Sequence, residues 1–274
     1  VLAATIVASY FILFPQEYEY FGNTLAATAG FGSNILFWKE SGYFERQSAL
    51  VPLLHTWSLS VEEQFYIFYP IFLMLAHRFA HRFLKFLVVS GLLISLSISV
   101  AGLEYGKFSA VFYLLPPRAW ELLIGAALAM GVVPSLKSTA LSNILGLSGL
   151  GMIACAVIFY TRETVFPGLA ALLPVLGAAL LIYTGAQEKT FPARLLASRP
   201  LVFTGKISYS LYLWHWPLIV FYNYASPQPI NLYSGSVILL LSFALSCATW
   251  RFVEQPSRRA ENISRKNIFI LAGA

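Results

Sequence analysis

The chain has 274 residues, of which 58% are hydrophobic and only 11% are charged, and its mean hydropathy is +0.70. A soluble domain carries about 25% charged residues, so this composition excludes a water-soluble globule and indicates a helical membrane protein. The net charge of +6 at pH 7 would suit nucleic acid, but the chain has no basic recognition motif. Cys155 and Cys247 lie in apolar runs without metal-ligand spacing, and they do not indicate a redox compartment.

Apolar stretches near the ~20 residues that a helix needs to cross a bilayer follow one another along the chain. We expect membrane-spanning helices at 58–76, 86–103, 112–133, 141–160, 166–184, 207–224 and 233–252, with truncated ones at 1–14 and from residue 268. The predicted fold class is therefore all-α, a polytopic integral membrane helix bundle of about eight or nine spans. Both ends fall inside apolar runs, so we interpret residues 1–274 as a single domain that is truncated at both ends.

Lysine and arginine are unevenly distributed among the predicted loops. Thirteen of them lie in the alternate loops 77–85, 135–139, 187–206 and 251–266, and only four lie in the loops between. Basic loops stay on the cytoplasmic side of the membrane, so these four loops are predicted to be cytoplasmic. A full crossing at 23–38 would break that alternation, and this stretch is short for a crossing. We therefore expect it to dip into the membrane or to lie at the outer interface.

The most informative segment opens the first complete predicted span, where ionisable side chains enter an apolar helix. Such groups are costly in a bilayer and are usually functional. If the helix includes His55, then His55, Ser58 and Glu62 share one face, and a His with a carboxylate partner can transfer protons. Ser60 and Glu63 also match a capping box, which would explain Glu63 by the satisfaction of amides at a helix start. Both interpretations of Glu63 stay open at this point.

Other polar groups recur later in the chain. Ser208, Tyr212 and His215 fall on one face of the predicted span 207–224, although aromatic belts and hydrogen bonds between helices would also account for them. Arg118 and Glu121 lie three residues apart and can pair with each other.

Glu254 is flanked by Arg251, Arg258 and Arg259. We expect it to form a solvated ion pair with these arginines.

Several kinds of site are not favoured by the sequence. The chain has no GxSxG elbow, P-loop, HExxH motif or dinucleotide fingerprint, and we predict no metal site. Haem ligation is disfavoured because His77 and His81 lie in a basic loop, while His55 and His215 stand alone on their helices.

These segments resemble the bacterial membrane acyltransferase-3 family, whose members O-acetylate lipopolysaccharide O-antigen, peptidoglycan and other glycans. The matching segments occur in the order of the family over nearly the whole chain, at 33–38, 41–44, 53–66, 118–122, 207–217 and 252–256. The resemblance implies a multi-pass protein of the bacterial inner membrane. It also implies that acetyl-coenzyme A is the cytoplasmic donor and that a glycan or lipid-linked glycan accepts the acetyl group on an outward-facing hydroxyl.

The resemblance and the helical faces together assign the expected site. We expect catalytic roles for His55, Ser58, Glu62 and Glu63, and substrate-binding roles for a second set that comprises Trp57, Arg118, Glu121, Ser208, Tyr209 and His215. The two polar faces should meet in one cavity, away from lipid. Positive charge on the cytoplasmic side should attract the phosphates of the donor; the residues expected to supply it are Arg258 and Arg259, with Arg78, Arg82, Arg199 and Lys206.

Two further expectations concern the rest of the protein and the main alternative. The first span of the family, which carries its best-known catalytic His and a partner Arg, should lie upstream of Val1, and larger relatives add an SGNH-type extracytoplasmic domain after the last span. A glycolipid transporter or flippase would also need polar residues in a multi-span bundle, and it is the alternative from another functional class.

Overall fold

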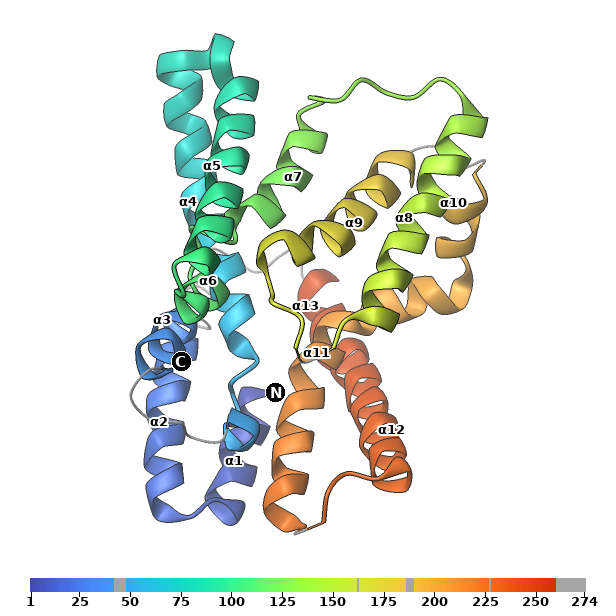
Figure 1. Cartoon of the computed structure of the whole chain (residues 1–274). Helices are drawn as coiled ribbons and strands as arrows, with labels where there is room; N and C mark the ends of the chain where they lie inside the picture. The colour runs from blue at the N-terminus through green and yellow to red at the C-terminus, as the bar shows by residue number, and fades with distance from the viewer. Residues whose placement is uncertain (42–47, 162, 186–189, 227, 260–274) are drawn as a thin grey trace. The chain divides into compact units, whose positions relative to one another are not determined.

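Figure 1 shows the computed structural model, which describes residues 1–41, 48–161, 163–185, 190–226 and 228–259. Every regular element among these residues is a helix, which confirms the predicted all-α fold class. The chain forms two compact units. The terminal unit comprises Val1–Phe21, Ala49–Pro52 and Val202–Ala274, and the central unit comprises Gly22–Ser48 and Leu53–Leu201.

Among the described residues, four stretches are long and apolar enough to cross a membrane, namely Thr56–Glu104, Thr139–Phe159, Gly168–Gly185 and Leu232–Ser257. The first contains two helices, α4 (Thr56–Ala80) and α5 (Leu84–Glu104), which a short 3-10 turn connects. These stretches agree with the predicted polytopic membrane bundle. The predicted span 207–224 lies within α11 (Arg199–Ala225), which is long enough to cross a membrane but is not among these four stretches.

The core of the central unit lies where α4 and α5 pack against α7 (Ala119–Ala129). Its buried side chains are Phe65 of α4, Val88 of α5, and Leu123 and Ala127 of α7. Beside this core, the same three helices form an apolar groove of about 250 Å³. Burial of such side chains fixes the axis of α7 against the α4–α5 pair.

The predicted span 112–133 is wrong, because the structure divides it into two helices. The short helix α6 (Phe108–Tyr113) ends before Leu114, and α7 begins at Ala119. Pro116 and Pro117 lie between them. Proline lacks the backbone N–H that a helix interior needs and clashes with the preceding turn, so two consecutive prolines end the helix. The break leaves Arg118 at the start of α7 and not in the middle of a helix.

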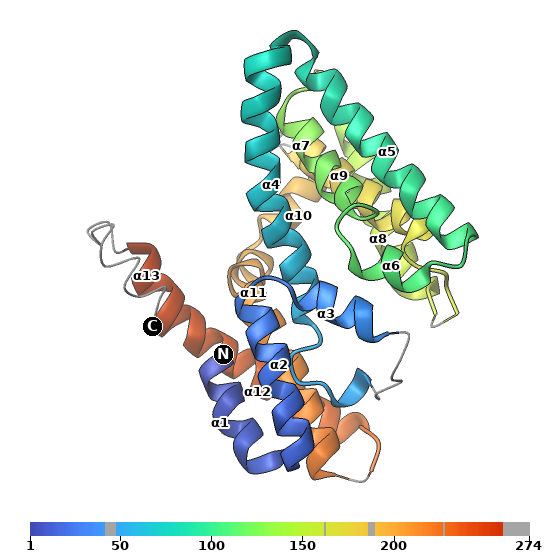
Figure 2. The same cartoon turned by 90° about the vertical axis from the view of Figure 1, so that its left-hand side faces the viewer.

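The stretch 23–38 also forms two helices, α2 (Pro15–Ala29) and α3 (Ser33–Glu40). They meet at Phe31, whose φ of 54° is in the left-handed region and stops a continuous helix. The expected position of this stretch at the outer interface stays a prediction. Figure 2 shows α3 beside the first half of α4, and α3 contacts α4.

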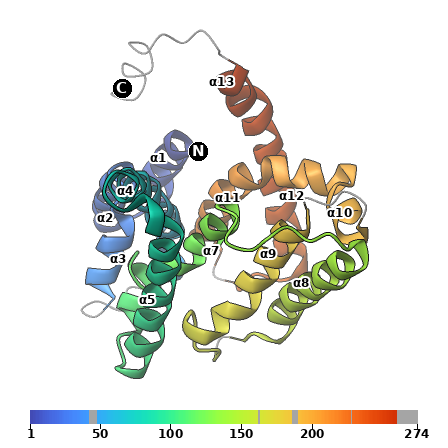
Figure 3. The same ribbon diagram turned by 90° about the horizontal axis from the view of Figure 1, so that it is seen from above.

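The helices α8 (Thr139–Phe159) and α9 (Leu172–Gly185) pack side by side, as Figure 3 shows from above. Their contact depends on small residues: a Cβ added at Gly149 would lie 2.7 Å from the carbonyl oxygen of Gly177. Close backbone approach at small residues is typical of helix pairs in membranes. A 3-10 turn (Gly168–Ala171) precedes α9, and the short α10 (Phe191–Leu196) follows it.

The terminal unit contains α1 (Leu2–Ile12), most of α11, α12 (Leu232–Thr249), a π-helical turn (Trp250–Glu254) and α13 (Gln255–Arg259). Asn231 and Ser234 form a reciprocal capping box that starts α12. The segment Ala49–Pro52 is attached to α11, because Trp216 Nε1 donates to the Val51 carbonyl at 2.9 Å. The predicted span from residue 268 lies outside the described residues.

Candidate active site

Helix α4 begins at Thr56, two residues before the predicted span, so Ser58 and Glu62 both lie within the helix. His55 is the N-cap residue, without a side-chain capping bond, and the helix starts at Thr56. Ser60 is therefore inside the helix, where its Oγ hydrogen-bonds Ser33 Oγ at 2.7 Å. The capping-box interpretation of Ser60 and Glu63 is wrong for this reason. The Ser60 hydroxyl instead connects α4 to α3 through its hydrogen bond with Ser33.

A second polar contact fixes the same pair of helices. Asn34 of α3 is fully buried, and its amide oxygen accepts a hydrogen bond from Gln64 Nε2 at 2.8 Å. Asn34 Nδ2 donates to the Tyr113 carbonyl at 3.0 Å, which also fixes the end of α6. Buried polar groups that are fully paired make a unique packing arrangement. Two neighbouring residues of α3 thus hold the first three turns of α4.

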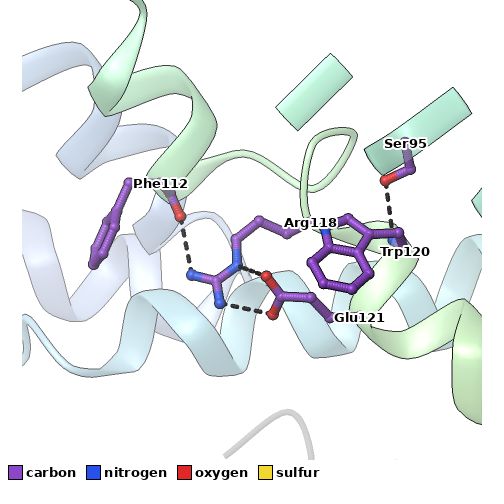
Figure 4. A network of polar contacts seen from close by, with 5 residues as sticks. All are labelled: Ser95, Phe112, Arg118, Trp120 and Glu121. Carbon is purple, nitrogen blue, oxygen red and sulfur yellow. Dashed lines mark hydrogen bonds and ion pairs between the residues drawn. The ribbon is translucent and has the colours of Figure 1, made fainter. Parts of the chain in front are cut away.

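Arg118 and Glu121 form a two-bonded ion pair at the start of α7, as Figure 4 shows. Arg118 Nε donates to Glu121 Oε1 at 3.1 Å, and Arg118 Nη2 donates to Glu121 Oε2 at 2.7 Å. The side chains are 14% and 19% exposed, so water screens the pair less than it would on an open surface. The fork geometry fixes the plane of the guanidinium group as well as its position.

Aromatic rings surround the Arg118 guanidinium. Its carbon lies 5.0 Å from the ring centroid of Trp57, 5.8 Å from that of Phe112 and 5.9 Å from that of Phe166. Arg118 Nη1 also donates to the Phe112 carbonyl at 3.4 Å. A cation beside aromatic faces is attracted by the ring quadrupoles. Phe112 and Phe166 were missed by sequence reasoning, because nothing in their local sequence separates them from lipid-facing phenylalanines.

Arg118, Glu121 and Trp57 line a cavity of about 70 Å³ in the central unit. Its lining residues are Trp57, Ser58, Val61, Glu62, Arg118, Glu121 and Leu122. The structure therefore brings together five of the residues singled out by sequence, from α4 and α7. Glu62 is exposed and adds a carboxylate to a cavity where Arg118 and Glu121 already neutralise each other. The cavity thus offers a carboxylate beside an oriented cation.

Two expected catalytic residues, His55 at the N-cap of α4 and Glu63 within this helix, are not among the lining residues of the cavity. His55 is buried, at 6% exposure, and Glu63 is half-buried. Their catalytic roles stay predictions.

The other polar cluster belongs to the terminal unit. Ser210 is 1% exposed, and its Oγ donates to Glu254 of the π-helical turn. Trp214 Nε1 donates to Thr249 Oγ1 at 2.9 Å, which bonds α11 to the end of α12. His215 Nδ1 lies 2.6 Å from the Tyr212 carbonyl of its own helix.

The expected residues Ser208 and Tyr209 are exposed on α11, and Ser208 Oγ bonds the Gly205 carbonyl of its own helix at 2.9 Å. Sequence reasoning missed Ser210, two positions away, which contacts Glu254. The meeting of this cluster with the cavity stays a prediction, since the two belong to different units. Arg258 and Arg259 lie in α13, and their side chains lie outside the description.

No group of three or more His, Cys, Asp or Glu side chains that could hold a metal ion occurs among the described residues.

Comparison with known proteins decides the family. A family described as an acyltransferase domain matches residues 1–251, which include the cavity and both of its helices. The chain belongs to this acyltransferase-3 family. No solved structure matches the chain.

Three named relatives of this family member are similar over most of its length. The O-acetyltransferase OatA of Staphylococcus aureus (strain NCTC 8325 / PS 47) is 31% identical, over 79% of this chain and 38% of its own length. The peptidoglycan O-acetyltransferase OatA of Listeria monocytogenes is 29% identical, over 79% of this chain and 37% of its own. The putative membrane-bound transacylase BcsY of Komagataeibacter xylinus is 31% identical, over 84% and 58%. The chain therefore spans little more than a third of the two OatA proteins.

Proposed function

We propose that the chain is the membrane part of an O-acyltransferase of the bacterial cytoplasmic membrane. It would transfer an acetyl group from acyl-coenzyme A to a hydroxyl of a cell-surface carbohydrate, such as peptidoglycan or lipopolysaccharide O-antigen. The observation that carries the proposal is the cavity of Glu62, Arg118 and Glu121, within a chain of the acyltransferase-3 family. Two relatives whose names specify O-acetylation support the acetyl group as cargo.

The chemistry of acyl transfer matches what the cavity residues offer. The acceptor hydroxyl must lose a proton as it attacks the thioester carbonyl, and the Glu62 carboxylate is the proposed base. The carbonyl oxygen becomes negative, and an oriented cation in a dry site stabilises that charge strongly. Arg118 is the proposed cation. Collapse of the intermediate breaks the carbon–sulfur bond, releases the coenzyme A thiolate and leaves the ester on the glycan.

The remaining cavity residues have supporting roles in this proposal. Glu121 holds the plane of the Arg118 guanidinium, so that the unused N–H groups of Arg118 have a fixed direction. Trp57 covers the guanidinium on one face. Ser58 lines the cavity beside Glu62 and is a proposed hydrogen-bond partner of the acceptor.

Both substrates are proposed to reach the cavity from opposite sides of the bilayer. The donor is proposed to enter from the cytoplasm, where Arg258 and Arg259 attract its phosphates. The glycan is proposed to use Ser208, Tyr209 and His215 on α11.

The proposal is tested by acetyl transfer in membranes that contain the complete protein. Radiolabelled acetyl-coenzyme A and a glycan acceptor should give base-labile label on the glycan, and membranes with the Arg118→Ala variant serve as the control. Movement of a glycolipid across the bilayer without any acetyl transfer would contradict the proposal and favour a flippase.

A further inference from the structure

We propose that Ser95 of α5 is a positioning residue for the Arg118–Glu121 pair. From the neighbouring helix α5, its hydroxyl oxygen would cap a backbone amide at the start of α7. The activity consequence rests on the proposed function, whereas the structural consequence does not.

The start of α7 lacks a capping side chain of its own. The first amides of a helix have no partner within the helix, and Ser, Thr, Asp or Asn at the N-cap normally supplies an accepting oxygen. Arg118 occupies the N-cap position of α7 and makes no capping bond. An arginine side chain cannot do so, because it has only donors. The amide of Trp120, two residues into α7, therefore needs an oxygen from elsewhere.

Ser95 provides that oxygen. Its Oγ accepts a hydrogen bond from the Trp120 backbone N–H at 2.9 Å, as Figure 4 shows. The same hydroxyl donates to the Pro116 carbonyl at 2.5 Å. Ser95 thus holds the chain on both sides of Arg118, and its side chain is only 5% exposed.

This arrangement explains how a charged residue can occupy the N-cap and still point into a cavity. Because Ser95 supplies the capping oxygen, α7 can begin at a residue whose side chain cannot cap and bonds Glu121 instead. The hydrophobic core fixes the axis of α7 through Val88 and Leu123, and Ser95 fixes the point along that axis where the helix begins. Since Arg118 and Glu121 are the N-cap and third residues of α7, their position depends on that point.

The chain contains a matched control on the same helix. Ser99 lies one turn further along α5, is 0% exposed, and its Oγ has no hydrogen-bond partner among the described residues. Replacing either serine by alanine removes one buried hydroxyl, but only Ser95→Ala leaves the Trp120 amide without its acceptor. An unpaired buried amide is costly, so the start of α7 should move or fray in that variant.

The structural test is a comparison of Ser95→Ala with Ser99→Ala in the complete protein in detergent. The readout is the ¹⁵Nε signal of Arg118, which is assigned by its disappearance in Arg118→Lys. We expect Ser95→Ala to shift or broaden this signal and Ser99→Ala to leave it at the wild-type position. A wild-type signal in Ser95→Ala, or the same change in both variants, would overturn the proposal.

The functional test is acetyl transfer by the same variants. Small misplacements of an active-site group cost up to about 100-fold in rate, so we expect Ser95→Ala to lose roughly 10-fold to 100-fold of kcat/KM. In the Arg118→Ala background, Ser95→Ala should cause no further loss, and losses that multiply would overturn the role through Arg118. Absence of transfer in the wild-type protein would instead reject the proposed function, while the Arg118 signal would still decide the role of Ser95.

Discussion

The two units each hold a carboxylate with a fixed partner, but the partners differ in charge and in origin. Glu121 of the central unit is paired with Arg118, three residues earlier on the same chain segment. Glu254 of the terminal unit accepts a hydrogen bond from the neutral Ser210, 44 residues away. A charged fork fixes the direction of the remaining N–H groups of the arginine, whereas a serine hydroxyl joins two helical segments. We therefore propose that the transfer step takes place in the cavity of the central unit, whereas the bond between Ser210 and Glu254 attaches α11 to the π-helical turn of the terminal unit.

The largest effect should follow removal of the cavity cation. We expect Arg118→Ala to lower acetyl transfer roughly 100-fold, because loss of one oxyanion-stabilising group costs about that much. Arg118→Lys keeps the charge but cannot make the two-bonded fork, so it should restore only part of the rate. Transfer is measured with radiolabelled donor in membranes, at matched protein levels. Full activity in a folded Arg118→Ala variant would remove Arg118 from the reaction.

A smaller effect should follow loss of the ring beside that cation. Trp57→Leu removes the aromatic face 5.0 Å from the guanidinium carbon. Contacts of this kind contribute about 0.5–2 kcal/mol, so we expect a loss of roughly 2-fold to 30-fold in kcat/KM. Trp57→Phe keeps a ring and should lose less. Equal losses in the two variants would show that Trp57 fills space and does not orient Arg118.

In the terminal unit we expect the main effect of a substitution to be on the free energy of unfolding. Ser210→Ala removes the hydrogen bond to Glu254, and bonds to charged groups contribute about 1.5–3 kcal/mol. Ser208→Ala is the matched control, since Ser208 is exposed and bonds only its own helix among the described contacts. Unfolding in detergent should show a lower free energy of unfolding for Ser210→Ala alone. Equal stability of the two variants would contradict the assigned role of Ser210.

The same comparison shows what could be predicted from sequence. The pair Arg118–Glu121 and the face of Ser58 and Glu62 follow from local helical spacing, and the structure places all four at one cavity. Ser210 could not be selected over Ser208, because the choice depends on where the π-helical turn that carries Glu254 lies.

In the fold, too, some features were predicted from the sequence and others were not. Long apolar runs predicted α4, α5, α8 and α12, since a bilayer demands such lengths. The helix breaks at Pro116 and at Phe31 were missed. The spans were predicted from the length of apolar runs, which does not take account of a proline pair or of a residue with left-handed backbone angles. The capping of the Trp120 amide at the start of α7 was not predictable either, since the accepting oxygen comes from Ser95 on another helix.

The smallest effect is expected at the proposed donor entrance. Paired charge reversal at Arg258 and Arg259 should raise KM for acetyl-coenzyme A roughly 3-fold to 10-fold, because local positive charge concentrates an anionic donor. The effect should shrink at high salt, where charges are screened. The measurement is KM at two ionic strengths in correctly inserted protein. An unchanged KM would remove both arginines from the donor path.

The most direct test of the cavity as the site of transfer uses its neighbouring carboxylates. Glu62 lines the cavity and Glu63, the next residue on α4, does not. Both substitutions, Glu62→Gln and Glu63→Gln, conserve shape and remove one negative charge. Initial rates of acetyl transfer in membranes of the complete protein should fall roughly 100-fold in Glu62→Gln, as expected for loss of a general base, and much less in Glu63→Gln. A larger loss in Glu63→Gln, or none in Glu62→Gln, would contradict the placement of the reaction in this cavity.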